Sequence, residues 1–251
     1  MGGDSLKCPF DISKLYCIPC DSSFKYDCTG ANITGGVGTP CNGKYMSCAC
    51  SSGREFSNGA CACDNSCTVG AIYYSDGTCS ACVDSNKTAV GVVVKDNELI
   101  IALKEAGNSW WSETTENHPN LVDYANVEAA RTDFSGKQNT LSLVNSGASY
   151  LAANLCYNYA PNGMEETQGE WYLPALGELY LYVLENEKLQ NSSSFLDMVP
   201  DPMYGTWTST EYDSTRVWEV VGFQDGGVVD YYIKHSSFAG MPPTSLCFLQ
   251  I

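Results

Sequence analysis

Cysteine thiols are the side chains of this sequence whose number and spacing could most clearly do chemistry. Fourteen cysteines occur among the 251 residues. Twelve of them lie between Cys8 and Cys82, and only Cys156 and Cys247 lie beyond that range. Pairs of thiols form disulfides under oxidising conditions, whereas thiolates can hold a zinc ion. The spacing and the surrounding residues must decide between these two uses.

The short spacings favour disulfides over metal binding. These spacings are Cys17-x-x-Cys20, Cys48-x-Cys50, Cys61-x-Cys63 and Cys79-x-x-Cys82. Two C-x-x-C pairs could supply a tetrahedral zinc site, which is the alternative. However, residues 1–84 contain no histidine, their cysteine count is even, and the C-x-C steps lie in glycine-rich surroundings. We therefore predict disulfides of open connectivity, no metal, no cofactor and an oxidising compartment.

The uneven cysteine distribution divides the chain into two domains near Asp84. Residues 1–84 are rich in Gly, Ser, Asn and Asp and poor in long apolar runs, so cross-links must replace much of a core. The segment "CACSSGREFSNGACAC" looks like a small epidermal-growth-factor-type module. We predict a disulfide-rich, loop-dominated domain over residues 1–84 and an ordered α+β domain over residues 85–251.

The net charge limits the partners of the protein. The sequence has 29 acidic and 13 basic residues, a formal net charge of -16 at pH 7. Nucleic acids and anionic membrane surfaces would repel such a chain. No apolar run approaches the ~20 residues that cross a bilayer, so we predict no direct membrane insertion. The first residues also lack the apolar core of a secretion signal, and we expect that signal to have been removed from an extracellular or cell-surface protein.

Residues 85–251 show the patterns of strands and helices that alternate along the chain. "AVGVVVKDNELIIAL" predicts a hairpin with its turn at residues 95–98. Apolar residues spaced by three and four predict one helix over residues 139–157. Beyond Pro202, "GTWTSTEY", "RVWEVVGF", "VVDYYIK" and "TSLCFLQI" predict short strands of a meander.

The stretch "GEWYLPALGELYLYVLENE" predicts a strand that turns directly into a helix at Pro174. A residue before proline is held in an extended conformation, which ends the strand at Leu173. The apolar stripe of the following helix is expected at Leu176, Leu179, Tyr180, Val183 and Leu184.

These motifs in this order carry a family resemblance. "WYLPALGEL", then "WTSTEY", a Trp-containing strand, an Asp-Gly-Gly turn and a terminal "SLCFLQI" resemble the Lcl C-terminal or Fibrobacter major-paralogue domain over residues 88–251. The resemblance implies a bacterial protein with a C-type-lectin-like fold. Family members often cap the second helix with Thr or Ser, but this chain has Ala175, which should forfeit ~1 kcal/mol. Glu178 still favours the helix N-terminus electrostatically.

The end of the chain also bears on the resemblance. The usual arginine is Leu246 here, whereas Cys247 matches relatives with a cysteine at this point. Cys156, at the end of the first helix, is the expected disulfide partner of Cys247. Such a bridge would close a loop of about ninety residues and contribute ~4 kcal/mol in the chain-entropy model.

Similar domains form the carboxy-terminal part of variable proteins made by diversity-generating retroelements, which implies a ligand-binding surface near the chain end. Alternation along the strands helps to choose its residues. Val229, Tyr231, Ile233, Trp218 and Val220 are expected to face the core, and Val228, Asp230, Tyr232, Lys234, Glu219 and Val221 to face outward. Trp207, Trp218 and Lys234 are interpreted as scaffold. The predicted ligand-binding residues are Asp213, Ser214, Thr215, Arg216, Val221, Asp230, Tyr232, His235, Ser237 and Phe238.

Other functions have weaker support in the sequence. The formylglycine-generating oxygenase, a relative by fold, uses a cysteine pair, but a structural disulfide explains Cys156 and Cys247 more simply. His118 and His235 show no spacing of a catalytic or metal site, so we predict no enzyme. The Glu-Pro-Asn and Trp-Asn-Asp motifs of calcium-dependent lectins are absent. We predict a surface recognition protein for an unidentified protein or glycan, and the alternative is a structural adhesin or pilus-like subunit.

Overall fold

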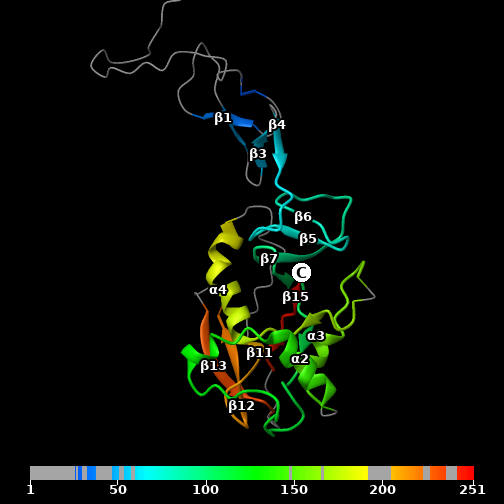
Figure 1. Ribbon diagram of the computed structural model, residues 1–251, viewed down its shortest axis with the longest axis vertical. Coiled ribbons are helices and arrows are strands. Elements are labelled where there is room, and N and C mark those ends of the chain that lie inside the picture. The colour runs from blue at the N-terminus through cyan, green and yellow to red at the C-terminus, as the bar shows by residue number, and fades with distance from the viewer. Residues whose placement is uncertain are drawn as a thin grey trace, which may run out of the picture. The chain divides into compact units, whose positions relative to one another are not determined.

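The computed structural model describes two compact units, Met1–Asp64 and Asn65–Ile251 (Figure 1). The described residues are 26, 28–29, 33–37, 47–50, 54–57, 60–146, 149–164, 167–191, 205–222, 227–235 and 242–251.

The first unit contains two small antiparallel hairpins in its described part. Strand β1 (Ile33–Val37) pairs with β2 (Ser47–Cys50), and β3 (Arg54–Ser57) pairs with β4 (Ala60–Cys63). A disulfide joins Cys28 to Cys48. The described part of the first unit therefore consists of short strands and a cross-link, which agrees with its composition. The cysteines of the Cys17-x-x-Cys20 spacing lie outside the described residues.

The second unit begins earlier than the cysteine distribution suggests, at Asn65 rather than after Asp84. The reason is strand pairing, because β5 (Ile72–Tyr74) pairs antiparallel with both β6 (Cys79–Ser80) and β7 (Ala89–Lys95). A disulfide between Cys67 and Cys79 ties this segment to the start of the unit.

A six-stranded antiparallel sheet runs in the order β10-β15-β8-β7-β5-β6. The predicted hairpin is confirmed, since β7 pairs with β8 (Leu99–Ala102) across a turn in which Asn97 has φ 54°. The last strand, β15 (Phe248–Gln250), lies between β8 and β10 (Trp171–Tyr172). The end of the chain is thereby built into the sheet that opens the unit.

A second sheet of five strands runs in the order β13-β12-β11-β14-β9. Its strands are β9 (Gly107–Asn108), β11 (Thr206–Glu211), β12 (Arg216–Val221), β13 (Val228–Ile233) and β14 (Thr244–Ser245). Only the β11 and β14 pair is parallel among its pairings. The first three predicted strands form a meander as β11, β12 and β13, but the predicted last strand divides into β14, parallel to β11, and β15, which joins the other sheet. The unit is α+β with mostly antiparallel sheets.

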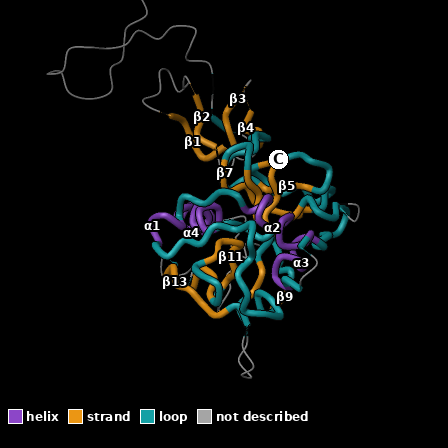
Figure 2. The backbone as a smooth tube through the Cα atoms, turned by 60° about the horizontal axis from the view of Figure 1, so that its bottom comes forward, coloured by secondary structure: helices purple, strands orange, loops and turns teal. Residues whose placement is uncertain are grey.

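The described part of the second unit contains four helices. They are α1 (Val127–Ala130), α2 (Gly136–Asn145), α3 (Leu151–Tyr157) and α4 (Leu176–Asn191). In Figure 2, α1 lies beside α4, and the Arg131 guanidinium stacks over the Tyr180 ring at 4.2 Å. The single helix predicted over residues 139–157 is wrong, because the chain forms two helices there. Helix α2 ends at Ser146, whose backbone N–H and hydroxyl both bond to the Leu143 carbonyl.

The strand-to-helix transition at Pro174 is confirmed, and its helix is capped by other parts of the chain. The Leu176 N–H donates to Thr210 Oγ1 at 2.9 Å, and the Gly177 N–H donates to the Asp133 carbonyl at 2.9 Å. These bonds satisfy backbone donors that a helix start leaves free. The hydroxyl that Ala175 lacks is thus supplied from β11.

Glu178 completes this cap from inside the helix. One of its carboxyl oxygens accepts a bond from the Ala175 N–H at 2.8 Å, and the other accepts the Tyr172 hydroxyl at 3.3 Å. This is the half of a capping box that the third helical residue provides. The carboxyl is buried, and burial raises the pKa of Glu178 to about 7. Glu178 therefore stabilises the start of α4 through direct hydrogen bonds, in addition to the electrostatic effect expected from the sequence.

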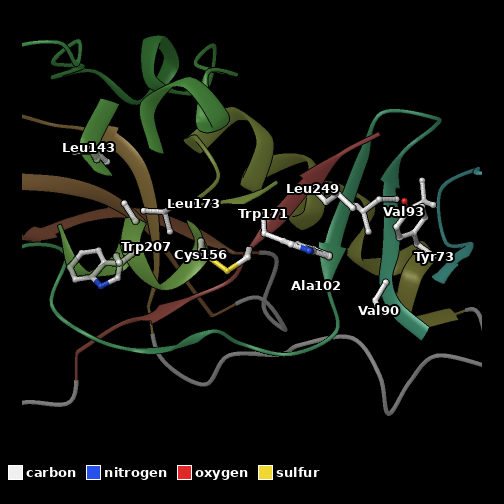
Figure 3. Close-up of a cluster of buried hydrophobic side chains, with 14 of the residues drawn as sticks. Tyr73, Val90, Val93, Ala102, Leu143, Cys156, Trp171, Leu173, Trp207 and Leu249 are labelled. Atoms are coloured by element: carbon white, nitrogen blue, oxygen red, sulfur yellow. A yellow bond between two sulfur atoms is a disulfide. The ribbon is translucent and has the colours of Figure 1, made fainter. Parts of the chain in front are cut away.

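Two clusters of buried side chains form the core of the second unit, one on each side of the sheets. Figure 3 shows the cluster that gathers Trp171, Leu173 and Trp207 around the Cys156 disulfide. The other cluster holds the buried face of α4. Leu176, Leu179 and Val183 are buried as predicted, but Leu184 is 58% exposed and Tyr182 is buried in its place.

The disulfide between Cys156 and Cys247 forms as expected. It joins the end of α3 to the segment between β14 and β15, across 91 residues of sequence. Both cysteines are fully buried. The bridge therefore holds helix and final strand together from within the core.

Candidate ligand-binding surface

The predicted ligand-binding residues divide between a turn and the outer end of the five-stranded sheet. Figure 1 shows β12 and β13 side by side, with β13 the last strand of the sheet. Asp213, Ser214, Thr215 and Arg216 form the turn from β11 to β12 and the start of β12. Val221 ends β12, Asp230 and Tyr232 lie on β13, and His235 follows β13. Ser237 and Phe238 lie outside the described residues.

Asp213 organises the turn between β11 and β12. Its carboxylate accepts bonds from the backbone N–H and hydroxyl of Thr215 and from the backbone N–H and side chain of Arg216. Burial acts to raise the pKa of Asp213, but these hydrogen bonds lower it to about 2. The Arg216 guanidinium also stacks over the rings of Tyr212 and Tyr231 at 4.3 and 4.6 Å. Asp213 and Arg216 therefore shape the turn, while Ser214 and Thr215 are exposed.

Strand alternation predicts the faces of β12 better than those of β13. Trp218 and Val220 are buried as expected. Tyr231 and Ile233 were expected in the core but are each 40% exposed, because β13 ends the sheet and is covered incompletely. The outward orientation expected of Lys234 is wrong, since its side chain is fully buried.

The cause of this burial is an ion pair. Lys234 Nζ bonds to Glu211 Oε1 and donates to the Glu116 carbonyl at 3.2 Å. The Glu211 carboxylate also accepts the His118 backbone N–H at 3.4 Å. Lys234 lies 5.1 Å from the centre of the Trp111 ring. The pair therefore fastens the segment of residues 111–118 to the five-stranded sheet, and Lys234 is scaffold as interpreted.

An aromatic cluster lies on one face of β13. The rings of Trp110 and Tyr232 are stacked with centroids 6.2 Å apart and planes within 4°. Trp207 lies 6.1 Å from Tyr232, and His235 lies 6.2 Å from Trp110. Tyr232 remains 41% exposed and Trp110 is partly buried. We call Trp110, Trp207, Tyr232 and His235 the aromatic surface, with buried Trp207 as its floor.

Trp110 was not among the predicted binding residues. Its position beside Trp111 in a polar stretch is typical of an exposed loop, but the sequence does not show which of the two tryptophans is buried. Trp111 is fully buried and donates its ring N–H to the Thr208 carbonyl at 2.9 Å. One tryptophan therefore anchors the segment, and its neighbour contributes to the surface.

Two carboxylates adjoin the aromatic surface. Glu219 is the direct cross-strand partner of Trp207 on one side and of Asp230 on the other. Directly opposed residues point to the same face of a sheet. Glu219, expected to face outward, is only 6% exposed, and its Oε2 accepts no hydrogen bond in the described part of the chain. Burial, and secondarily the charge of Asp230, raises the pKa of Glu219 to about 7.

A glycine makes room for this carboxyl group. A Cβ atom on Gly205 would lie 2.1 Å from Glu219 Oε2. Any larger residue at position 205 would displace the carboxyl. Gly205, which directly precedes β11, therefore leaves the space that the Glu219 carboxyl fills.

A second aromatic group lies on the other face of β13. Tyr231 packs against Tyr212 and Trp218, with centroids 4.3 and 5.9 Å apart. Trp218 in turn donates its ring N–H to the Tyr124 carbonyl at 2.8 Å. Arg216 stacks on these tyrosines and is paired with Asp213. The charged side chain of this group therefore already has its partners within the protein, unlike the carboxylates beside the aromatic surface.

The described residues hold neither a metal-ligand cluster nor a membrane-spanning helix. No three His, Cys, Asp or Glu side chains gather there as metal ligands, and no helix there has the length and apolarity to cross a membrane. A groove of about 460 Å³ lies between α3 and the segment around β9, lined by Ala106, Ser109, Leu151, Asn154, Leu155 and Tyr159, among others. It contains none of the predicted ligand-binding residues.

No model of a known protein family matches the chain, and no curated protein matches it. Among solved structures, the chain is similar to a fimbrial protein from Bacteroides ovatus ATCC 8483, with 17% identity and a TM-score of 0.49. The match covers 73% of this chain and 49% of that one, so the chain spans about half the length of the fimbrial protein.

Proposed function

We propose that the protein is a secreted or surface-displayed bacterial recognition protein that binds a ligand at the aromatic surface. The single observation that carries the proposal is the stacking of Trp110 on Tyr232, which lies on the outermost described strand of the sheet. Aromatic side chains offer large contact areas with few rotatable bonds, and they are enriched among residues that dominate binding energies.

The proposed location is supported by the disulfides. Cys28 with Cys48, Cys67 with Cys79, and Cys156 with Cys247 form cross-links in both units. Structural disulfides persist in oxidising surroundings and are rare in a reducing cytosol. An extracellular or cell-surface position suits a protein that is cross-linked in this way.

We further propose that residues 88–251 are a C-type-lectin-like domain. The resemblance of the "WYLPALGEL" and "SLCFLQI" motifs is one support. The pairing of the last strand β15 with β8, and the α4 helix that starts directly after β10, are the other supports. In this interpretation the sheets and helices form a fixed frame that presents β12, β13 and the intervening turns.

Ligand binding can be tested with arrays of immobilised glycans and peptides. The labelled protein should bind a subset of the array, and Trp110→Ala and Tyr232→Ala should each lose that binding by tenfold or more. Phe134→Ala is a matched control, because Phe134 is an exposed aromatic residue outside the aromatic surface. Equal binding by Tyr232→Ala and by the control would refute the proposed surface.

Diversification of this surface is a separate part of the proposal, supported by the family resemblance. Adenine-directed mutagenesis would leave a near-copy of the last ~100 nucleotides of the gene beside a reverse-transcriptase gene, differing mainly at adenines. Sequencing the genomic neighbourhood tests this directly. If no such copy is found, the diversification part of the proposal fails and the ligand-binding part stands.

The second candidate function is a structural adhesin or pilus-like subunit whose domain mediates assembly. The observation that favours it is the exposure of Val228, Tyr231, Tyr232 and Ile233 on β13, at the end of the sheet. An exposed edge strand can pair with another chain. Concentration-dependent assembly in sedimentation experiments, abolished by a charged residue at position 228 or 233, would support this candidate.

A further inference from the structure

We propose that the aromatic surface binds a positively charged side chain, a lysine or arginine of a partner polypeptide, between its rings and the carboxylates of Glu219 and Asp230. The inference rests on the proposed function, because it names the class of ligand for the same surface. It follows from the two carboxylates, from the rings beside them, and from the strand edge next to both.

The two carboxylates are directly opposed across β12 and β13. Like charges in directly opposed positions of a sheet destabilise each other. Glu219 is only 6% exposed, and its Oε2 has no hydrogen-bond donor in the described part of the chain. A buried carboxyl oxygen without a donor is costly. A bound cation would supply the missing donor and offset the repulsion.

The neighbouring rings suit the same ligand. Trp207 is the cross-strand partner of Glu219, and its ring lies 6.1 Å from that of Tyr232. Tyr232 stacks in turn with Trp110. The faces of tryptophan and tyrosine rings attract lysine and arginine side chains. Rings and carboxylates on one face therefore favour a cation, and the net charge of -16 disfavours an acidic ligand.

The protein's own cations near this face are engaged elsewhere. Lys234, on the same strand, is paired with Glu211 inside the core. Arg216, the cross-strand partner of Ile233, is paired with Asp213 and stacks on Tyr231. His235 contacts the ring of Trp110. Among the described contacts, no Lys or Arg pairs with either Glu219 or Asp230, so the charge of this surface is open to a partner.

A polypeptide fits this position better than an isolated cation. In the described part of the molecule, β13 has a strand neighbour, β12, on one side only. An extended chain can add to such an edge through backbone hydrogen bonds and place alternate side chains on one face. A basic residue at the centre of that chain would then lie over the face that carries Asp230 and Tyr232. Burial raises the pKa of Glu219 to about 7, and a bound cation would lower it.

The test uses the full chain and four acetylated, amidated pentapeptides. Their sequence is Thr-Val-X-Val-Thr, with Lys, Arg, Gln or Glu at X, and binding is measured by NMR titration and calorimetry. We expect the Lys and Arg peptides to bind at least tenfold more tightly than the Gln peptide, and the Glu peptide to show no binding. N-acetyl-lysine amide alone should bind more weakly than the Lys peptide, because it cannot pair with β13.

Variants separate charge recognition from general attraction to an acidic protein. Glu219→Gln and Asp230→Asn should each weaken the Lys peptide five- to tenfold. Glu98→Gln is the matched control, because it removes one exposed carboxylate in the turn between β7 and β8 and should bind as the wild type does. Glu219→Gln removes a buried unpaired carboxyl, so it is expected to fold, and its circular dichroism spectrum checks this.

The outcomes distinguish this inference from the proposed function. Equal affinity for the Lys and Gln peptides, or equal effects of Glu219→Gln and Glu98→Gln, would overturn the cation inference. If neutral probes bind and Tyr232→Ala abolishes that binding, the recognition surface stands without the cation. If no peptide binds, the inference fails, and the array experiment with Tyr232→Ala then decides the function separately.

Discussion

Replacing Lys234 with methionine should strongly destabilise the second unit. Methionine keeps an unbranched stem beside the Trp111 ring but removes the charge that Glu211 faces. Both side chains of the ion pair are fully buried, so the variant leaves Glu211 as an uncompensated buried charge. Removing one partner of a buried pair costs about 3–5 kcal/mol. The free energy of unfolding should therefore fall by about this amount at neutral pH.

A double-mutant cycle in urea, followed by tryptophan fluorescence under oxidising conditions, measures this effect. Glu211→Gln retains an acceptor for the His118 N–H, which lies 3.4 Å from Glu211 Oε1. The double variant Lys234→Met/Glu211→Gln should therefore be more stable than Lys234→Met alone, with a coupling above ~2 kcal/mol. A cost below ~1 kcal/mol for Lys234→Met, or additive single effects, would refute the reasoning from burial.

Three further predictions concern the frame and its titration. Thr210→Val removes the side-chain cap of α4 and should lower stability by about 2–3 kcal/mol in urea unfolding, because buried donors and acceptors lose partners; an unchanged midpoint would contradict the capping role. The double variant Cys156→Ala/Cys247→Ala should lose about 4–5 kcal/mol in the same assay, from the chain entropy of a 91-residue loop. Because the pKa of Glu219 is raised from 4.5 to about 7, folding favours its protonated form, and stability should decrease as pH rises from 4.5 to 7. Glu219→Gln should remove up to about 3 kcal/mol of that decrease between pH 5 and 8, leaving the similar contribution of Glu178; identical pH profiles would contradict the assignment.

Local sequence signals predicted the regular elements well. Proline, alternation and the turn residues located the hairpin of β7 and β8, the start of α4 and the strands β11 to β13. These features depend on neighbouring residues, which a sequence displays directly. The break between α2 and α3 was missed because apolar spacing continues through it, while the hydrogen bonds of Ser146 end the helix.

Features set by long-range contacts could not be predicted in the same way. Lys234 is buried because Glu211, distant in sequence, meets it, and alternation alone assigned it to the outside. Trp110 joins Tyr232 across more than a hundred residues of chain. The sequence indicated the strands that carry the candidate site, but which side chains meet there follows from the pairing of the sheet.

The buried polar groups that hold the fold are separate from the exposed side chains of the candidate surface. Thr210 caps α4, Glu211 holds Lys234, and Cys156 holds Cys247, and all of these groups are buried. None of them belongs to the predicted ligand-binding residues. Exposed side chains such as Ser214, Thr215, Asp230 and Tyr232 carry few of the contacts that hold the unit together. Substitutions there should therefore change binding far more than stability, and this separation is what a recognition surface requires.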